Sequence, residues 1–425
     1  MAHLLMVDSW VTEMGQFLPQ AIERLGHTFT FATRDLTHYL KKPSPKGWHP
    51  LLNARSIVTT DTNDAASLIA WAERYHQFAP FDGVITSCDY YLSTVAQLAE
   101  HFGLPTTPPD AFETARLKHR MRAALDRAGL PNARYKVTTT WKETRAAAEA
   151  IGYPVVLKPT DLCSSMFVVV ARDEQTLRGA FDQLDDFPIN TRKITREPIF
   201  LVEEYLRGEE ISVEAFTFDG QTTILGLTDK SLSEPPAFIE TGHMTPAIVS
   251  PENAEATIDL VQKSLRAVGY THGLSHTEVK LTPDGPRIVE INVRCGGGHI
   301  SQLYRLTQGV DPVEMMVQLA LGQRPTYEPK ATGVQSATVM YYVAPRGGTV
   351  GQVRGLDGLD RDPNVVEWHL PDLAGTTLRE PIDNNDCLGH VLTVDREGSG
   401  ARAKAEAALA RIELSYADER VGALA

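Results

Sequence analysis

Charged and amide side chains recur at alternate positions in two neighbouring segments of the chain, residues 276–280 and 290–294. They are His276, Glu278, Lys280, Glu290, Asn292 and Arg294. Side chains two positions apart on a strand share one face of the sheet, so each segment would present a polar face. Between the segments, Thr-Pro-Asp-Gly-Pro at 282–286 is rich in residues that favour turns. The pattern predicts a β-hairpin.

The expected register brings acids together across this hairpin. If it is symmetric about Asp284, Glu278 faces Glu290 and His276 faces Asn292. The other face would be largely apolar and would seal against a core. It carries Thr277, Val279, Leu281, Val289, Ile291 and Val293. Facing carboxylates repel unless a cation lies between them, and hard oxygen ligands suit magnesium bound to phosphate. A solvated polar face is the alternative, but the apolar opposite face and the three glycines that follow favour a metal site.

Length and charge restrict the class of protein. The chain has 425 residues, enough for two or three domains, with an ordinary globular composition of 22% charged and 42% hydrophobic residues. A net charge of −13 argues against binding to nucleic acid or to anionic membranes. The four cysteines lie far apart without a metal-binding spacing, which suits a reducing compartment. The start of the chain lacks the basic region of a signal peptide, and no apolar run approaches the length of a membrane span. We therefore expect a cytoplasmic protein.

The first hundred residues alternate between short apolar runs and helical stretches. The runs are Leu4–Val7, Phe29–Ala32, Ser56–Thr59 and Gly83–Thr86. Helical stretches at 19–25 and 65–75 lie between them. This alternation predicts an α/β fold with a Rossmann-like parallel sheet that is covered on both faces. Ligands of such sheets gather beyond the carboxyl ends of the strands. That position nominates Asp8, Ser9, Ser87 and Asp89, although turn formation and helix capping explain them equally well.

The remaining chain predicts three further units. We expect successive antiparallel strands at 200–205, 211–218 and 222–228, and a helix at 254–268 that leads into the hairpin. From about residue 323, strand and helix signals indicate a smaller α+β lobe. The expected domains span residues 1–108, 109–200, 201–325 and 326–425.

Lys158 ends a buried-looking strand, residues 153–159, and precedes a loop of small and hydroxylated residues at 160–165. A lysine there can hold phosphate together with the amides of the loop, although a lone lysine is more often a snorkelling side chain. Further along, an apolar strand, a hinge and two acids follow one another over residues 200–214. Such a hinge can offer backbone groups to a purine, and an acid beyond it can bind ribose hydroxyls.

The order of these features resembles the ATP-grasp superfamily of carboxylate–amine ligases. The matching positions are Lys118, Lys158 with its loop, Val202–Leu206 with Glu210, Glu278, and Glu290-x-Asn292-x-Arg294. The resemblance runs from the N-terminal domain to about residue 325. The EINxRxGGG form, followed by a separate lobe, looks most like the L-amino-acid ligase (dipeptide synthetase) branch, which includes peptide-antibiotic ligases. It implies an ATP-grasp fold, in which 109–200 is the small lid lobe and 201–325 the catalytic lobe.

The resemblance implies a nucleotide site. Lys118 and Lys158 would hold the phosphates of ATP. The residues that would line the adenine are Glu203, Glu204, Tyr205 and Leu206. Glu210 would bind the ribose. The loop over the phosphates is usually rich in glycine, whereas residues 161–166 contain none, and here Ser164 and Ser165 would supply amides and hydroxyls.

The resemblance also implies the reacting end of the site. Glu278, Glu290 and Asn292 would bind Mg²⁺, with Mn²⁺ as a substitute, and Arg294 would approach an acyl phosphate. Residues 228–246 are rich in functional groups, and loops carry specificity on rigid scaffolds. We assign substrate binding to Glu240, His243, His276, Arg294, Gly297 and Gly298, and catalytic roles to Arg294, Lys158 and His243.

Within the substrate set, Glu240 would bind a substrate ammonium group, and His243 would take a proton from the attacking amine. Loop capping and surface charge explain both residues equally well. Gly297 and Gly298 would let the substrate approach the backbone beside Arg294, with a tight turn as the alternative.

The implied reaction joins a small-molecule carboxylate to a small-molecule amine, both most simply amino acids, in two steps. ATP converts the acid to an acyl phosphate, and the amine displaces phosphate to give a dipeptide-like amide. The family often dimerises, so we expect a homodimer. Two alternatives stay open. One is a ligase of purine or carboxylation metabolism that acts on formate or bicarbonate. The other is a nucleotide sensor without turnover, against which the full set of metal ligands argues.

Overall fold

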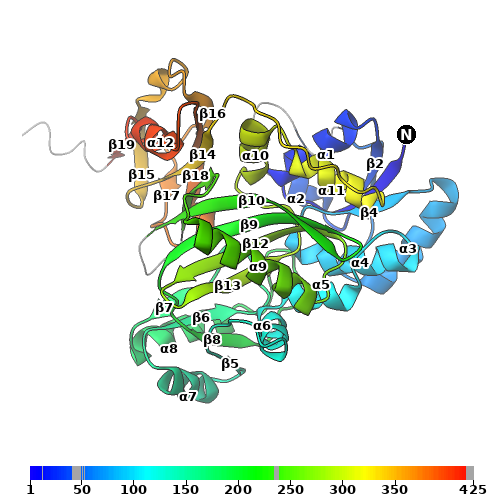
Figure 1. Ribbon diagram of the computed structural model, residues 1–425, viewed down its shortest axis with the longest axis horizontal. Helices are drawn as coiled ribbons and strands as arrows, with labels where there is room; N and C mark the ends of the chain where they lie inside the picture. The colour runs from blue at the N-terminus through cyan, green and yellow to red at the C-terminus, as the bar shows by residue number, and fades with distance from the viewer. Residues whose placement is uncertain (12, 41–48, 50, 52, 234–238, 418–425) are drawn as a thin grey trace, which may run out of the picture.

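The computed structural model describes residues 1–11, 13–40, 49, 51, 53–233 and 239–417, and Figure 1 shows how they are arranged. Within these ranges the strands form four sheets. The N-terminal sheet (blue) and the C-terminal part of the chain (orange and red) flank a large central sheet (green), and a smaller sheet (teal) lies beside it.

The N-terminal sheet is parallel in all its pairings, as the alternating pattern predicts. Its strands, in spatial order, are β3 (Ser56–Thr59), β2 (Thr28–Thr33), β1 (His3–Val7) and β4 (Gly83–Ile85). The helices of this part of the chain are α1 (Met14–Arg24), α2 (Leu36–Leu40), α3 (Ala65–Phe78), α4 (Leu92–His101) and α5 (Pro109–Arg116). Leu4 and Met6 of β1 pack in one core with α1, and Leu5 and Val7 pack in another with α3. Both faces of the sheet are therefore covered.

A second sheet, here called the lid sheet, is antiparallel. Its order is β5 (Tyr135–Thr138), β8 (Phe200–Glu204), β6 (Val155–Pro159) and β7 (Val169–Ala171), and the helices α7 (Trp141–Ile151) and α8 (Glu174–Asp185) pack on it. The expectation that residues 200–205 run on into the next two strands is wrong, because β8 pairs with β5 and β6. The chain crosses to the central sheet at residues 205–208, so the predicted hinge is the connection between two sheets.

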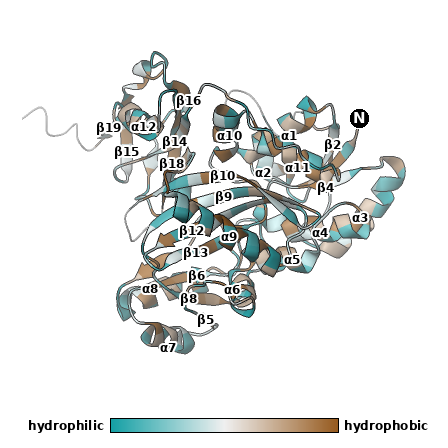
Figure 2. Ribbon diagram, viewed as in Figure 1, coloured by the Kyte–Doolittle hydropathy of each residue, from teal (hydrophilic) through white to brown (hydrophobic). Residues whose placement is uncertain are grey.

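The central sheet contains the predicted hairpin. Its order is β13 (Gly285–Asn292), β12 (Gly273–Thr282), β9 (Glu209–Phe218), β10 (Gln221–Leu232), β11 (Glu240–Thr245), β14 (Ser336–Val343), β18 (Cys387–Asp395) and β16 (Val365–His369). Helix α9 (Pro251–Ala267) covers one face, where Leu260 and Leu265 pack against Val279 and Ile291. Figure 2 shows mixed polar and apolar colouring along α9, as expected of an amphipathic helix on a sheet. The neighbouring helices are α6 (Lys118–Arg127), α10 (Ile300–Gln308) and α11 (Pro312–Ala320).

The register of the hairpin is confirmed in its polar half and differs beyond it. His276 pairs with Asn292 and Glu278 with Glu290, as symmetry about the turn predicts. The register then shifts, and Val279 pairs with Ile288. Ile288 is fully buried in the core, while Val289 lines the cavity described below, so its expected place on the apolar face is wrong. An extra residue in one strand reverses the alternation of side chains on its far side.

The C-terminal part of the chain is joined to the central sheet. Strands β14, β18 and β16 extend that sheet, and α12 (Ala401–Leu409) packs on β14 and β18. A small sheet completes it, with β17 (Thr377–Leu378), β15 (Gly348–Arg354) and β19 (Glu413–Tyr416). None of the helices in the described ranges has the length and apolar character needed to cross a membrane.

Candidate active site

All four parts of the structure contribute to one cavity of about 520 Å³. Every residue that the sequence analysis assigns to the site lines it, from Lys118 on α6 to Gly297 and Gly298 after β13. The same wall includes residues that the analysis did not assign. Among them are Glu13, Arg122, Tyr341, Asn384 and Cys387. The predicted residues are thus brought together, and their individual roles stay predictions.

Lys118 and Lys158, which the sequence analysis expects at the phosphates, are both buried. Lys158 lies 2.7 Å from a carboxylate oxygen of Glu203, which also accepts hydrogen bonds from Arg122 at 2.7 and 3.0 Å. Burial raises the pKa of Glu203, but Arg122 and Lys158 outweigh it and lower the pKa to about 2. Lys118 donates to the carbonyl oxygen of Leu162 at 3.0 Å.

The side chain of Glu203 is thus engaged with Lys158 and Arg122, and the adenine role expected for Glu203 stays a prediction. Arg122 is one turn beyond Lys118 on α6, and nothing in its local sequence distinguishes it from a surface arginine.

The glycine-free loop takes the backbone conformation that glycine usually supplies. Ser164, Ser165 and Phe167 have φ angles of 58°, 56° and 58°. Left-handed backbone costs an ordinary residue about 1–2 kcal/mol, so the loop needs support. Asp161 provides some of it by accepting hydrogen bonds from Arg196 at 3.2 Å and from the amide of residue 197 at 2.9 Å.

The hairpin acids are paired with lysines. Glu290 lies 3.1 Å from Lys118, and Glu278 lies 2.9 Å from Lys230. Among the described residues no group of three or more histidine, cysteine, aspartate or glutamate side chains could hold a metal ion. The predicted set differs in using two carboxylates and the amide of Asn292. These are hard oxygen donors of the kind that Mg²⁺ takes, and their chemistry fits that ion once Lys118 is displaced from Glu290.

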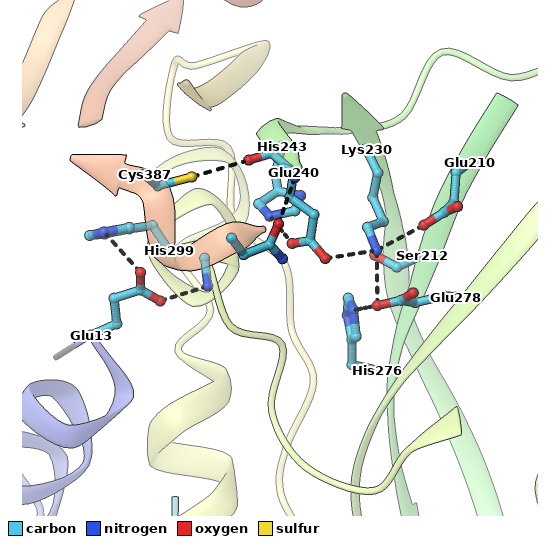
Figure 3. Close-up of polar contacts among 12 residues, drawn as sticks. Glu13, Glu210, Ser212, Lys230, Glu240, His243, His276, Glu278, His299 and Cys387 are labelled. Carbon is cyan, nitrogen blue, oxygen red and sulfur yellow. Dashed lines mark hydrogen bonds and ion pairs between the residues drawn. The ribbon is translucent and has the colours of Figure 1, made fainter. Parts of the chain in front are cut away.

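Lys230 is the centre of the charged network and was not assigned from the sequence. It is 1% exposed, and its Nζ lies 2.9 Å from Glu210, 2.9 Å from Glu278 and 3.4 Å from Glu240 (Figure 3). Burial lowers the pKa of Lys230, but the three carboxylates raise it well above its ordinary value. Glu240 and Glu210, predicted to bind an ammonium group and a ribose, are thus both engaged with this lysine. The only sequence signal for Lys230 is its place in the functional stretch 228–246, of which residues 234–238 lie outside the described residues.

Two histidines and an arginine complete the site. His276 lies 2.7 Å from Glu214; burial lowers the pKa of His276, but Glu214 and then Glu278 raise it to about 9. His243 lies 3.4 Å from Glu240. Arg294 is bound to Asp89 at 2.6 Å, so one acid nominated from the N-terminal strand ends does reach the cavity.

Comparisons with known proteins agree with this geometry. Residues 151–302 match the family described as ATP-grasp domain, residues 20–106 match the ATP-grasp N-terminal domain, and residues 340–417 match the L-amino acid ligase C-terminal domain 2. The chain is 30% identical over 254 residues to alanine–anticapsin ligase of Bacillus subtilis, covering 56% of this chain and 53% of that protein. It is 30% identical over 395 residues to phosphoribosylamine–glycine ligase of Phenylobacterium zucineum, covering 88% and 89%.

Among solved structures, an L-amino acid ligase from Bacillus licheniformis superposes with a TM-score of 0.79 at 21% identity, covering 98% of this chain and 99% of that one. The fold is that of ATP-grasp enzymes. The chain belongs to this family of carboxylate–amine ligases, and its C-terminal part is the domain found in L-amino acid ligases. The chain spans about half the length of alanine–anticapsin ligase.

Proposed function

We propose that the protein is an ATP-dependent ligase that joins the carboxylate of one amino acid, or of a related acid, to the amine of another. One observation carries this proposal. A single cavity holds two buried lysines suited to phosphate, a facing pair of carboxylates suited to Mg²⁺, and Arg294 beside a glycine run. The L-amino acid ligase domain contributes Tyr341 and Cys387 to the same cavity, which supports amino-acid substrates.

The phosphate end works by exchange of partners. Lys118 now neutralises Glu290, and Lys230 neutralises Glu278. When ATP binds, Lys118 and Lys158 would turn to phosphate oxygens, which would free Glu290 for the metal together with Asn292 and the Glu278 oxygen that Lys230 does not contact. Bound Mg²⁺ would neutralise phosphate charge and hold the γ-phosphate in line with the attacking acid. Mn²⁺ prefers similar oxygen donors and would substitute.

The acyl end is built around Arg294. A substrate carboxylate oxygen attacks the γ-phosphorus, the bond to the bridging oxygen breaks, and ADP leaves. The amine nitrogen then attacks the acyl carbon, the carbon–oxygen bond to phosphate breaks, and an amide forms. Burial lowers the pKa of Arg294, but Asp89 raises it above its ordinary value, so the guanidinium stays charged. Its role would be to stabilise the acyl phosphate and the tetrahedral oxyanion, while His243 takes the proton of the amine.

Water must be kept from the acyl phosphate. The lid sheet carries Lys158 and its loop, and it joins the central sheet through residues 205–208. We propose that this lobe closes over ATP, which would exclude water and bring Lys158 onto the phosphates.

A phosphate-release screen tests the function. Purified protein with Mg²⁺ and ATP would be given pairs of the twenty proteinogenic amino acids, and mass spectrometry would identify the product. We expect release that requires both an acid and an amine, and no release by Glu290→Ala. Formate and bicarbonate belong in the same screen because they are the alternative acids that the sequence leaves open. Release with those two acids alone would favour purine or carboxylation metabolism, and ATP consumption that ignores every added acid and amine would favour a sensor.

Location and assembly belong to the same proposal. We propose a cytoplasmic protein, which is supported by the four cysteines being free thiols. The homodimer expected from the resemblance stays a prediction, and light scattering of the purified chain would test it.

A further inference from the structure

Glu13, His243, Gly298 and Tyr341 meet in one part of the cavity wall. The Gly298 amide donates a hydrogen bond to Glu13 at 2.8 Å. A Cβ atom placed on Gly298 would lie 2.6 Å from Nε2 of His243 and 2.7 Å from the hydroxyl of Tyr341. Figure 3 shows Glu13 reaching from the N-terminal part of the chain toward His299. The four residues come from separate parts of the chain, so this corner exists only in the folded molecule.

Two polar groups in this corner lack a partner among the described residues. They are Nδ1 of His243, whose side chain is 2% exposed, and the hydroxyl of Tyr341. A buried polar group without a hydrogen bond costs about 1–3 kcal/mol, so two such groups on residues that line a cavity indicate a ligand that satisfies them. Burial, with smaller contributions from Glu13 and Glu240, raises the pKa of Tyr341 above its ordinary value, so the phenol keeps its proton and its oxygen can accept.

The two nearby acids differ in how far their charge is compensated. Glu240 lies 3.4 Å from both Lys230 and His243, and its pKa falls to about 2 because the charge of Lys230 and then the hydrogen bond with His243 outweigh burial. Glu13 has His299 at 4.0 Å as its ion-pair partner within the described residues, and its side chain is 35% exposed. Of these two carboxylates, Glu13 therefore has the less compensated negative charge, and it can bind a cationic group of a ligand.

We propose that Glu13 and the hydroxyl of Tyr341 bind the α-ammonium group of the amino acid whose carboxylate is phosphorylated. This inference rests on the proposed function and moves the ammonium role from Glu240 to Glu13. The acid substrate is the partner to choose, because its ammonium stays charged through both steps, whereas the attacking amine must be neutral. The bare Cα of Gly298 lets Nε2 of His243 and the Tyr341 hydroxyl approach the backbone beside Glu13, where a Cβ would lie 2.6 and 2.7 Å from them.

The preference of the enzyme between acid substrates with and without an α-ammonium group tests the subsite. L-alanine and propionate, and L-phenylalanine and 3-phenylpropionate, are matched acids with and without the ammonium group. We expect Glu13→Gln to lower kcat/KM for the amino acids by at least about tenfold, to leave the desamino acids within about twofold, and to leave KM for ATP unchanged. If a desamino acid is not turned over, its inhibition constant against the amino acid replaces kcat/KM. Glu23→Gln, on the same helix and paired with Asn53, is the control and should match wild type.

A second variant covers the case in which Glu13→Gln folds poorly. Tyr341→Phe should raise KM for the amino acids used as acid substrates about threefold to tenfold, and it should leave KM for the desamino acids unchanged. Tyr342→Phe is its control, because the Tyr342 hydroxyl contacts the carbonyl of Ile412 in the C-terminal part. Equal losses with both classes of acid, or no loss with either, would overturn the subsite. Failure of wild-type protein to release phosphate with any pair would instead overturn the proposed function.

Discussion

Arg294 shows what a local pattern reveals and what it leaves out. Alternation over residues 290–294 places it on the face of the hairpin acids, and it lines the cavity with them. Its partner, Asp89, lies 205 positions earlier in the chain. Strand-end reasoning nominated Asp89 separately, yet no spacing connects the two residues, because their contact arises from packing of the N-terminal sheet against the hairpin.

Loss of Arg294 should affect turnover and not nucleotide binding. Arg294→Ala should lower kcat by about 100-fold or more, since removal of an oxyanion-stabilising group typically costs about 3–4 kcal/mol. KM for ATP should stay within about threefold. Steady-state phosphate release would measure both constants. Arg287→Ala is the control, because Arg287 lies on β13, the strand that precedes Arg294, and its side chain is bonded to backbone carbonyls of the turn. Turnover by Arg294→Ala at the control's rate would remove Arg294 from the chemistry.

Glu203 should make the free energy of unfolding depend on pH in the acid range. Its pKa is lowered from 4.5 to about 2, so its contribution is present above pH 4.5 and is lost as the pH falls toward 2. Between pH 5.5 and pH 3 the loss should be about 2 kcal/mol. Glu203→Gln cannot titrate, so urea denaturation of this variant should lack that part of the pH dependence although it is less stable throughout. If the free energies of unfolding of the wild type and of Glu203→Gln changed in parallel with pH, Glu203 would not be held ionised by Arg122 and Lys158.

At the scale of elements, the hairpin was predicted because turn chemistry and alternation are local. The pairing of Glu278 with Glu290 follows from them. The register shift beyond Glu278 does not follow from local patterns, because a bulge depends on how β13 fits its neighbours. For this reason the predicted face of Val289 was wrong. The lid loop is similar. Its composition gave no sign that Ser164 and Ser165 would adopt left-handed backbone, which contacts made by Asp161 support.

The glycine run offers a matched pair of substitutions. Gly298 has φ +60°, and a Cβ there would meet His243 and Tyr341 below 3 Å, whereas a Cβ on Gly297 would meet nothing within 4 Å. We expect Gly298→Ala to lower the free energy of unfolding by about 1–3 kcal/mol, and Gly297→Ala to change it by less than about 0.5 kcal/mol. Chemical denaturation of both variants would measure this. Equal stabilities would mean that the corner around Gly298 is looser than these distances indicate.

At the scale of the whole molecule, the site is assembled from parts that the sequence presents as separate. The N-terminal sheet supplies Asp89, the lid sheet Lys158, and the central sheet Glu278. The C-terminal lobe was expected as a separate unit, yet β14, β18 and β16 continue the central sheet and bring Tyr341 into the cavity. Periodicity predicts each part, but Lys230 with its three acids, Glu13 and Tyr341 are defined by long-range packing, which no local pattern records.

The central claim is ligation through an acyl phosphate, and oxygen transfer tests it most directly. An amino acid labelled with ¹⁸O in its carboxylate would be incubated with the protein, Mg²⁺, ATP and an amine partner from the screen. The account predicts one labelled oxygen in each phosphate released, in step with amide formed, because a carboxylate oxygen attacks the γ-phosphorus and leaves with it. Unlabelled phosphate, or label recovered in AMP, would contradict an acyl phosphate and with it the roles proposed for this site.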